Sequence, residues 1–406
     1  MMMRKPEDFF NPDSKYKALL LSAVTFGLAC GLYKGVMDNY LAEVVAMTKF
    51  DRGVLEFFRE LPGLLLIFIL AALYTFSAER IYKTGAFIMV LGMGMLAIVP
   101  ASRALVTLSI FTYSLGEHMQ FGMRSTLSLN YSQEGRGGSA LGFQTSIYEG
   151  GTLMGYIAVA GVFLLAGRTP ELYRPIFWTS AAIFALGFAA SLRLTGNSGA
   201  DRAKSRFYFR KKYSKYYMLE VFYGARKQIF FTFGPYVLVL FYGASAMTIS
   251  LLFAVSAISC FIASPVIGRI IDRLGYKIVM ISDTLILVIV CFFYGFAHHI
   301  FPMPVAFAIC CLNYVLDSVI SLASMASNVY VQDISDNATE VKATISTGLS
   351  VNHLISILIA LFGGWIWQTL GIETLFVLSA ILGLFNSAYA ATINEGKLRN
   401  GRRPLP

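Results

Sequence analysis

The chain has 406 residues, of which 56% are hydrophobic and only 14% are charged, and its mean hydropathy is +0.64. Soluble domains carry about a quarter charged residues, so this composition excludes an ordinary soluble protein and predicts a chain that lies largely within a membrane. The net charge of +10 comes mainly from segments that we assign to one side of that membrane. This asymmetry follows the positive-inside rule and does not indicate a nucleic-acid-binding protein.

The first half of the chain contains six apolar segments long enough to cross a bilayer as helices, which takes ~20 residues. A polar segment, residues 1–16, precedes them, and we interpret it as a cytoplasmic tail without a cleavable signal peptide. The helices are expected at about 17–44, 51–76, 85–100, 103–131, 140–166 and 174–193.

Residues 194–214 interrupt the apolar pattern, because this segment is rich in Gly, Ser, Lys and Arg. We interpret it as a cytoplasmic linker whose basic, aromatic part either lies on the anionic inner leaflet or is solvated. Six more helices are expected at about 216–242, 247–271, 278–296, 304–330, 344–369 and 373–393, followed by a polar, basic tail at 394–406.

These segments predict an all-α polytopic membrane protein whose twelve transmembrane helices form two six-helix bundles, residues 17–193 and 215–393. The distribution of Lys and Arg places both termini in the cytoplasm. We therefore expect a multi-pass protein of the cytoplasmic (inner) membrane, in contact with the lipid bilayer and acting as a monomer.

The joint between two apolar segments at residues 268–277 is almost without a loop and contains Gly268, Asp272, Arg273, Gly275 and Lys277. Such a joint requires a residue free of backbone strain, which Gly275 supplies. Asp272 is able to accept hydrogen bonds from a helix N-terminus. The cations of this segment place it in the cytoplasm.

A similar order of acid, arginine and lysine occurs in the first half as Glu79, Arg80 and Lys83, with Thr75 and Tyr82 where the second copy has glycines. The pattern G-x-x-x-D-R-x-G-x-[KR] resembles the signature loop of the major facilitator superfamily, which lies there between the second and third helices of each half. The resemblance implies two related halves, a gating role for these loop residues, and a substrate site near the bilayer midplane where the halves meet.

A weak internal repeat agrees with this resemblance. The offset that superposes the acid-arginine pairs of the two loops also superposes Lys34 on Lys227. A slightly larger offset places the helix at 140–166 on the helix at 344–369 and brings Glu149 onto His353. We therefore expect a duplicated six-helix unit.

Charged residues at helix centres cost about 2.5–3.5 kcal/mol on insertion scales, so each is a functional candidate. Lys34 and Asp38 lie four residues apart and share one face of their helix. We expect Lys34 to meet an anionic group of a substrate, with Asp38 holding Lys34 or exchanging a proton with it. Alternatively, the two charges neutralise each other and stiffen the helix.

The helix at 103–131 carries Glu117, His118 and Arg124. Many members of the superfamily have an R-x-x-Q-G run here that is implicated in proton coupling, but in this chain Glu117 replaces the arginine and Arg124 follows later. We interpret Glu117 and His118 as proton-coupling candidates and Arg124 as a substrate-binding candidate. The alternative for His118 is a hydrogen bond to a neighbouring helix.

Glu149 lies in the helix at 140–166, close to Gly150, Gly151 and Gly155, which allow a close helix approach. With no opposite charge nearby in the sequence, Glu149 is a candidate for substrate binding or for proton coupling. The drug-antiporter branch of the superfamily has a Gly-Pro-rich motif in this helix. The absence of proline from residues 140–166 argues against that branch.

The second half carries Arg226 and Lys227 side by side. Adjacent residues on a helix point about 100° apart, so both are not expected to face a cavity, and the repeat favours Lys227 as the substrate-binding residue. By symmetry with the first half, Asp317 is expected to pair with Lys227 and to take part in proton coupling. Asn352 and His353 complete the predicted binding residues.

No metal site or cofactor is expected. The five cysteines fall in apolar segments, where thiols behave as small hydrophobes. His298 and His299 are interpreted as an interfacial pair rather than a metal site. Glu56, Arg59 and Glu60 are interpreted as a gate or helix-end network.

The sequence therefore predicts a secondary active transporter of a small organic solute, anionic or zwitterionic, with protons as the coupling ion and alternating access as the mechanism. The chain contains no Walker-type motif, so a gradient rather than ATP is the expected energy source, and the chain is not expected to be an enzyme. An exporter or flippase of amphiphiles, drugs or lipids is the alternative. A polytopic membrane enzyme that uses Glu117 and His118 as a base is a more remote one.

Overall fold

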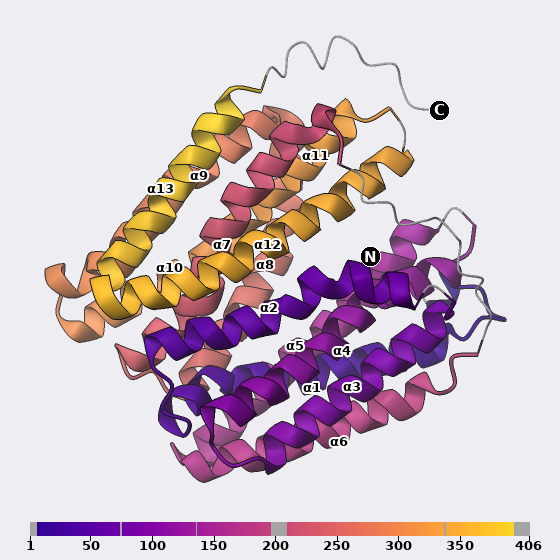
Figure 1. Cartoon of the computed structure of the whole chain (residues 1–406), viewed down its shortest axis with the longest axis horizontal. Coiled ribbons are helices and arrows are strands. Elements are labelled where there is room, and N and C mark those ends of the chain that lie inside the picture. The colour runs from indigo at the N-terminus through magenta and orange to yellow at the C-terminus, as the bar shows by residue number, and fades with distance from the viewer. Residues whose placement is uncertain (1–5, 74, 135, 196–208, 337, 394–406) are drawn as a thin grey trace. The chain divides into compact units, whose positions relative to one another are not determined.

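The computed structural model describes residues 6–73, 75–134, 136–195, 209–336 and 338–393 (Figure 1). Most of the predicted linker at 194–214 and all of the predicted tail at 394–406 lie outside the described residues, as do the first five residues of the predicted tail at 1–16.

The described chain is built from helices, and its one β-type contact is an isolated bridge between Phe10 and Ser132. In chain order the elements are η1 (Pro6–Asp8), α1 (Tyr16–Glu43), α2 (Lys49–Ala72), α3 (Ala78–Ile98), α4 (Arg103–Asn130), α5 (Gly137–Ala166), η2 (Pro170–Leu172), α6 (Tyr173–Ser191), η3 (Lys211–Tyr213), α7 (Ser214–Leu240), α8 (Ala246–Leu274), α9 (Tyr276–Ile300), α10 (Met303–Ile320), η4 (Ser321–Ser324), α11 (Met325–Ile334), α12 (Ala338–Leu370) and α13 (Ile372–Ala391). When α10, η4 and α11 are taken as one broken span, these elements correspond to the twelve predicted helices.

Nine of the described helical spans are long and apolar enough to cross a membrane by length and composition. The long helices outside this group are α2, α4 and α7. Each of these three carries charged residues well inside the helix, for example Glu60 on α2, Glu117 on α4 and Arg226 on α7. The charged residues of these three helices therefore set them apart from the nine apolar spans by composition.

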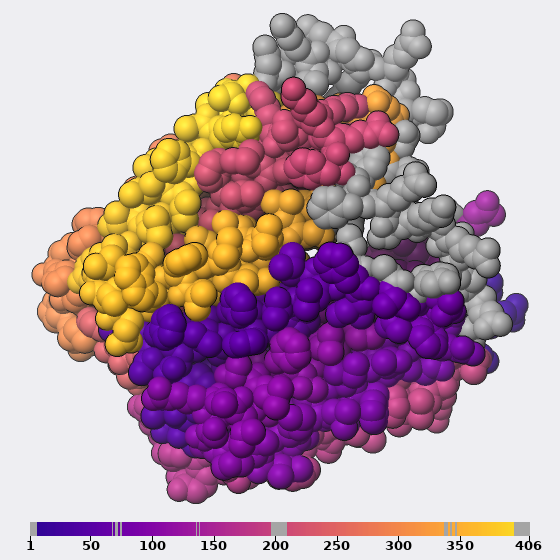
Figure 2. Space-filling view, in the orientation of Figure 1, coloured from indigo at the N-terminus to yellow at the C-terminus, as the bar shows by residue number. Residues whose placement is uncertain are grey.

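The surface of α13 shows how such a helix meets lipid. Its exposed large side chains recur every three or four residues and so form one stripe: Val377, Ile381, Leu384 and Phe385. Ser379, Gly383 and Asn386 lie on its other side and are buried. The yellow surface of α13 in Figure 2 is an outer face of its unit. An apolar outer stripe with small and polar residues inside is the arrangement expected of a membrane-spanning helix.

Contacts divide the chain into two units. The first is made of Met1–Ala46, Phe58–Ser205 and Ser245–Ala254, and the second of Met47–Phe57, Arg206–Ala244 and Val255–Pro406. In the first unit the main helix pairs are α1 with α5, α1 with α6, α3 with α4, and α3 with α6.

The second unit repeats this packing. Its main pairs are α7 with α12, α7 with α13, α9 with α10, and α9 with α13, which are the equivalent helices in the order of the second half. The same four helix pairs therefore occur in both units, in agreement with the weak internal repeat in the sequence.

Helices α1 and α5 of the first unit approach each other closely. A Cβ atom added to Gly151 would lie 2.4 Å from the carbonyl oxygen of Val24, and one added to Gly155 would lie 2.5 Å from that of Leu28. Gly150, in contrast, faces open space. The predicted close approach therefore depends on two of the three glycines named from the sequence.

This contrast gives a direct test of the α1–α5 contact. We expect Gly155→Ala to lower the stability of the protein by about 1–3 kcal/mol, because the added methyl group overpacks a backbone contact. Gly150→Ala is the matched control, and it is expected to be neutral or stabilising by up to ~1 kcal/mol, since alanine favours helix and nothing obstructs it. Thermal unfolding of both variants in detergent measures the difference, and equal unfolding temperatures would contradict the packing described here.

The two loops that resemble the signature motif have one contact in common. Lys83 donates to the carbonyl oxygen of Leu194 at 3.2 Å, and Lys277 donates to that of Ile393 at 2.9 Å. Both acceptors follow the last helix of their unit. The lysine comes four residues after the acid in the first loop and five residues after it in the second, yet both reach an equivalent carbonyl.

The joint between α8 and α9 is a single residue. Gly275 has φ +88°, a left-handed conformation that glycine adopts without steric cost, as the sequence predicted. Asp272 and Arg273 are exposed, and Asp272 accepts no hydrogen bond from a described residue. In the first loop, the buried carboxylate of Glu79 accepts a hydrogen bond from Tyr131 at 3.4 Å.

Candidate functional site

The centre of the first unit contains an ion pair between α1 and α4. Lys34 Nζ lies 3.3 Å from Glu117 Oε1, and the two side chains are 36% and 19% exposed. The sequence suggested that Lys34 pairs with Asp38, and this was wrong: Lys34 extends across to α4, while Asp38 lies one turn further along α1 and is buried. The pair therefore joins two helices instead of stiffening one.

Tyrosines and a thiol surround this ion pair. Tyr113 donates from its hydroxyl group to Glu117 Oε1 at 3.2 Å, and the same hydroxyl lies 3.6 Å from Cys30 Sγ. The ring of Tyr33 packs on that of Tyr113, with 4.9 Å between centroids. Glu117 thus contacts an ammonium group and a hydroxyl group, while the side chains of Lys34 and Glu117 remain partly exposed.

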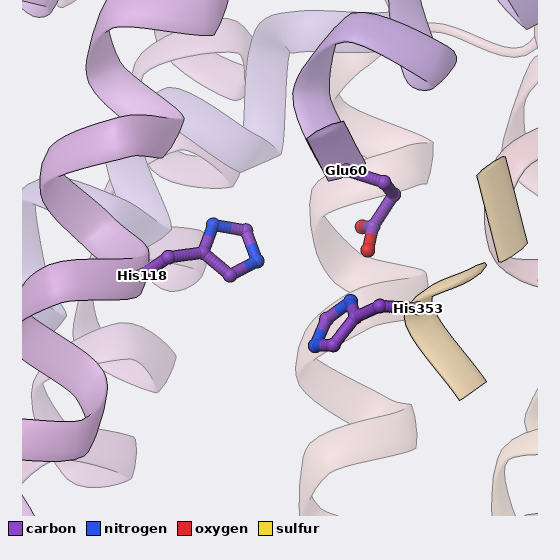
Figure 3. Close-up of side chains that lie close together, drawn as sticks. All are labelled: Glu60, His118 and His353. Carbon is purple, nitrogen blue, oxygen red and sulfur yellow. The ribbon is translucent and has the colours of Figure 1, made fainter. Parts of the chain in front are cut away.

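A second polar group connects α2 with α4. Arg59 and Glu60 form an ion pair, and Ser114 donates to the Arg59 carbonyl oxygen at 2.5 Å. His118 Nδ1 lies 2.9 Å from the Ser114 carbonyl oxygen, so the predicted proton-coupling histidine bonds within its own helix. Figure 3 shows Glu60 and His118 turned toward the same space, and a carboxylate oxygen of Glu60 lies within 4.8 Å of a ring nitrogen of His118. The figure also labels His353, which belongs to α12 of the second unit.

Arg124 is the buried cation of α4. It is 6% exposed, and its guanidinium carbon lies 3.8 Å from the centroid of the Tyr148 ring and 5.5 Å from that of Phe121. It forms no ion pair with a described residue, and its Nε has no hydrogen-bond partner among them. A desolvated guanidinium held only by ring faces retains its capacity to bind an anionic group.

Glu149 lies next to Tyr148 on α5 but is exposed. It forms neither an ion pair nor a hydrogen bond with the described residues. Tyr156 follows Glu149 by seven residues and therefore lies on the same face of α5. Tyr156 interacts electrostatically with both Glu149 and Lys34. Glu149 is therefore on the side of α5 that faces the Lys34 group, as a candidate with no fixed partner.

The charged centre of the second unit is built on Arg226 of α7. Its Nη2 lies 2.5 Å from Asp283 Oδ2 on α9, and the two side chains are 2% and 6% exposed. Its guanidinium carbon is 5.0 Å from the centroid of the Tyr223 ring. Of the two adjacent cations, Arg226 is the residue that points into the unit, whereas Lys227 is exposed and forms no ion pair with a described residue. The preference for Lys227 as a substrate-binding residue stays a prediction.

Asp317 on α10 belongs to the same centre. It is buried and interacts electrostatically with both Arg226 and Asp283. The predicted pairing of Asp317 with Lys227 is therefore replaced by a group of one guanidinium and two carboxylates. Because the ion pair with Asp283 already neutralises the guanidinium, the group carries one excess negative charge unless it takes up a proton.

The other predicted residues of the second unit lie on α12 beside a buried acid of α7. Asn352 donates to Glu220 Oε2 at 3.3 Å, and Ser327 donates to Glu220 Oε1 at 3.0 Å. Lys227 interacts electrostatically with Glu220. His353 follows Asn352 on α12 and is half-buried.

The start of α2 contributes to the second unit through Glu56, which is fully buried. Arg52 pairs with Glu56 Oε2 at 2.8 Å, and Gln228 of α7 donates to Glu56 Oε1 at 3.0 Å. The arginine also lies over the ring of Tyr236, 5.8 Å from its centroid. This cluster agrees with the interpretation of the region as a helix-end network.

Several residues of these groups were not identified from the sequence. Asp283 and Glu220 are single acids within helices of the second half, and the rule that marked Lys34 would have marked them too. Tyr113 and Tyr148 could not have been found in this way, because tyrosine is common in membrane helices and only the fold shows which rings meet a charge.

A comparison with protein-family models matched residues 216–401 to the model described as Major Facilitator Superfamily. No curated protein matched the sequence.

Solved structures gave extensive matches at low identity. The nucleoside transporter NupG superposes with a TM-score of 0.73 and 18% identity, over 94% of this chain and 99% of that one. The peptide transporter POT in complex with alafosfalin gives 0.71 and 13%, over 94% and 95%. A D-xylose-proton symporter gives 0.70 and 12%, over 94% and 98%. The predicted all-α polytopic fold is confirmed over nearly the whole chain.

Proposed function

We propose that the chain is a member of the major facilitator superfamily and a secondary active transporter of a small polar organic solute. The match of residues 216–401 to the family model and the likeness of the fold support this proposal. The observation that carries the proposal is the Lys34–Glu117 ion pair within two membrane-spanning helices. A charge pair at that depth is costly, and its partial exposure makes both charges accessible to a solute.

The same group supports an anionic or zwitterionic substrate. Arg124 offers a guanidinium without a carboxylate partner among the described residues, and guanidinium groups bind carboxylates and phosphates through paired hydrogen bonds. Glu117 offers a negative charge to an amino group, with Lys34 able to change partners. Tyr148 and Tyr156 offer ring faces and hydroxyl groups for the rest of the molecule.

The structural relatives carry nucleosides, peptides and xylose according to their descriptions. Peptides are zwitterions, so they agree best with the charges proposed here to bind the solute. For this chain, amino acids and short peptides are therefore the first solutes to test, followed by organic acids, nucleosides and sugars.

Proton coupling is assigned in this proposal to the Arg226–Asp283–Asp317 group. Its two carboxylates share one guanidinium, so uptake of one proton neutralises it and release of that proton recharges it. Glu117, by contrast, is paired with Lys34, and His118 contacts the Ser114 carbonyl oxygen of its own helix. These two residues and Glu149 are the alternative proton carriers.

The remaining predicted residues take supporting roles in this proposal. Asp38, Glu149, Lys227, Asn352 and His353 would contact the solute. The loop residues would act in gating as the two units move during alternating access: Glu79, Arg80, Lys83, Gly268, Asp272, Arg273, Gly275 and Lys277.

A solute screen followed by a flux assay tests the function. A ligand stabilises the state that it binds: at a hundredfold excess over Kd, the free energy of unfolding rises by about 2.7 kcal/mol, and the unfolding temperature rises with it. We expect one solute class to stabilise the purified protein, and the same solute to accumulate in proteoliposomes under an inward proton gradient. Stabilisation and flux should both weaken in Arg124→Ala. Flux that needs no protein, or a solute that is chemically converted, would contradict the transporter assignment.

A further inference from the structure

One cluster of ligand-type side chains lies outside the groups described above. It is formed by His298 and His299 in the last turn of α9 and Glu373 in the first turn of α13. His299 Nε2 lies 2.9 Å from Glu373 Oε1 and His298 Nε2 lies 3.4 Å from the same oxygen atom. The sequence favoured an interfacial histidine pair at this position, and it did not indicate the carboxylate.

The convergence of these three side chains has a structural cause. Adjacent helix residues normally point about 100° apart, but here the two imidazole rings lie against each other, with 3.9 Å between centroids. Glu373 reaches both rings because α13 passes close to α9 at Gly295, where an added Cβ would contact the Glu373 Cα at 3.5 Å. Gly371, with φ +95°, turns the chain into α13 just before Glu373. The ligands are thus brought together by the backbone.

We propose that His298, His299 and Glu373 form a binding site for a divalent transition metal ion, with zinc as the first choice. Ligand atoms ~2.0–2.1 Å from a tetrahedral zinc ion lie about 3.4 Å apart, and the two nitrogen–oxygen distances here are 3.4 and 2.9 Å. All three ligand atoms lie within 4.8 Å of one another. A metal ion would enter between them after small side-chain rotations.

The chemistry and exposure of the cluster fit this class of ion. Two imidazoles and one carboxylate suit zinc, copper, nickel or cobalt, whereas magnesium and calcium require oxygen ligands. The side chains of His298, His299 and Glu373 are 12%, 57% and 32% exposed. His298 is thus held in place, while the exposed edge of His299 leaves an entry path and room for a water ligand.

Zinc titration of the intact, detergent-purified chain tests the proposal, with any polyhistidine tag removed. We expect one zinc ion per chain. His299→Ala and Glu373→Gln should each weaken binding at least about tenfold, since even indirect partners of a metal are worth 10–100-fold. The chain has four histidines, so the variant His118→Ala with His353→Ala is the matched control, and it is expected to bind zinc as the unmodified chain does.

Two further measurements distinguish this site from zinc binding by the cysteines and from weak binding at the protein surface. Cobalt in place of zinc should give the visible spectrum of nitrogen and oxygen ligands, without the thiolate charge-transfer bands that the cysteines would produce. Zinc should raise the unfolding temperature of the unmodified chain and of the control, but not that of His299→Ala. Stoichiometric binding that persists in His299→Ala and Glu373→Gln, or no zinc binding by the unmodified chain, would overturn the assignment. Transport plays no part in either measurement, so the result is independent of the proposed function.

Discussion

Replacing Glu117 with Gln is expected to lower the stability of the protein by about 1–3 kcal/mol and to abolish transport. The substitution leaves the Lys34 ammonium group without a carboxylate partner inside the first unit. Loss of one partner of a fully buried ion pair costs ~3–5 kcal/mol, and the smaller value applies here because the Lys34 side chain is 36% exposed. At ~2–4 °C per kcal/mol for a unit of this size, thermal unfolding in detergent measures the change.

A double-substitution cycle separates stability from function. Lys34→Met should destabilise the protein as Glu117→Gln does, because it leaves the carboxylate unpaired. The double variant carries neither charge, so we expect most of the stability to return while transport stays absent. Glu149→Gln is the matched control for stability, since this carboxylate has no ion pair among the described residues and should change it by less than ~0.5 kcal/mol. Additive losses in the double variant would show that the two charges do not interact.

Replacing Asp317 with Asn is expected to remove proton-driven accumulation of the solute while exchange of solute across the membrane continues. The substitution takes away the excess negative charge of the Arg226–Asp283–Asp317 group, so the group no longer needs a proton to become neutral. With one proton per solute, a pH gradient of one unit supports about tenfold accumulation. In proteoliposomes containing Asp317→Asn the ratio should fall to about 1, with counterflow retained.

Two further variants make this test specific. Asp336→Asn changes an aspartate that is 76% exposed, pairs with Lys212 and lies outside the membrane spans, and it should accumulate solute normally. Arg226→Ala should instead destabilise the second unit by about 3–5 kcal/mol, because it leaves Asp283 buried without its cation. If Asp317→Asn accumulates solute as the unmodified chain does and Glu149→Gln does not, the proton carrier is Glu149.

The positions of the helices were predictable because they depend on the hydropathy of consecutive residues, which can be read directly from the sequence. Each apolar run is long enough to cross a membrane, so the helix positions follow from the sequence without knowledge of any contact. The departures are local: α3 begins at Ala78 rather than near residue 85, and the tenth span is broken at η4. Hydropathy does not register either feature, since a polar first turn and a change in helix type leave the apolar run almost unchanged.

The sequence shows which charged residues lie within helices, but it does not show which of them meet. Lys34, Glu117 and Asp317 were marked because a charge within an apolar helix is costly, and this argument needs only the sequence. Their partners depend on which faces of the helices meet. Arg226 and Lys227 show the limit. An uncertainty of one residue in the repeat offset turns the expected side chain by about 100°, so the offset does not tell which of the two residues points into the helical unit.

The contacts of Lys83 with the Leu194 carbonyl and of Lys277 with the Ile393 carbonyl have a consequence for how such loops are recognised. Both acceptors are main-chain atoms, so any residue type at position 194 or 393 supplies the same oxygen. Each contact therefore depends on the side chain of the lysine but not on the side chain of its partner. Methods that detect contacts through correlated substitution at two positions would not detect such a contact. The first loop therefore lacks both motif glycines and still makes the same lysine–carbonyl contact within its unit as the second loop does.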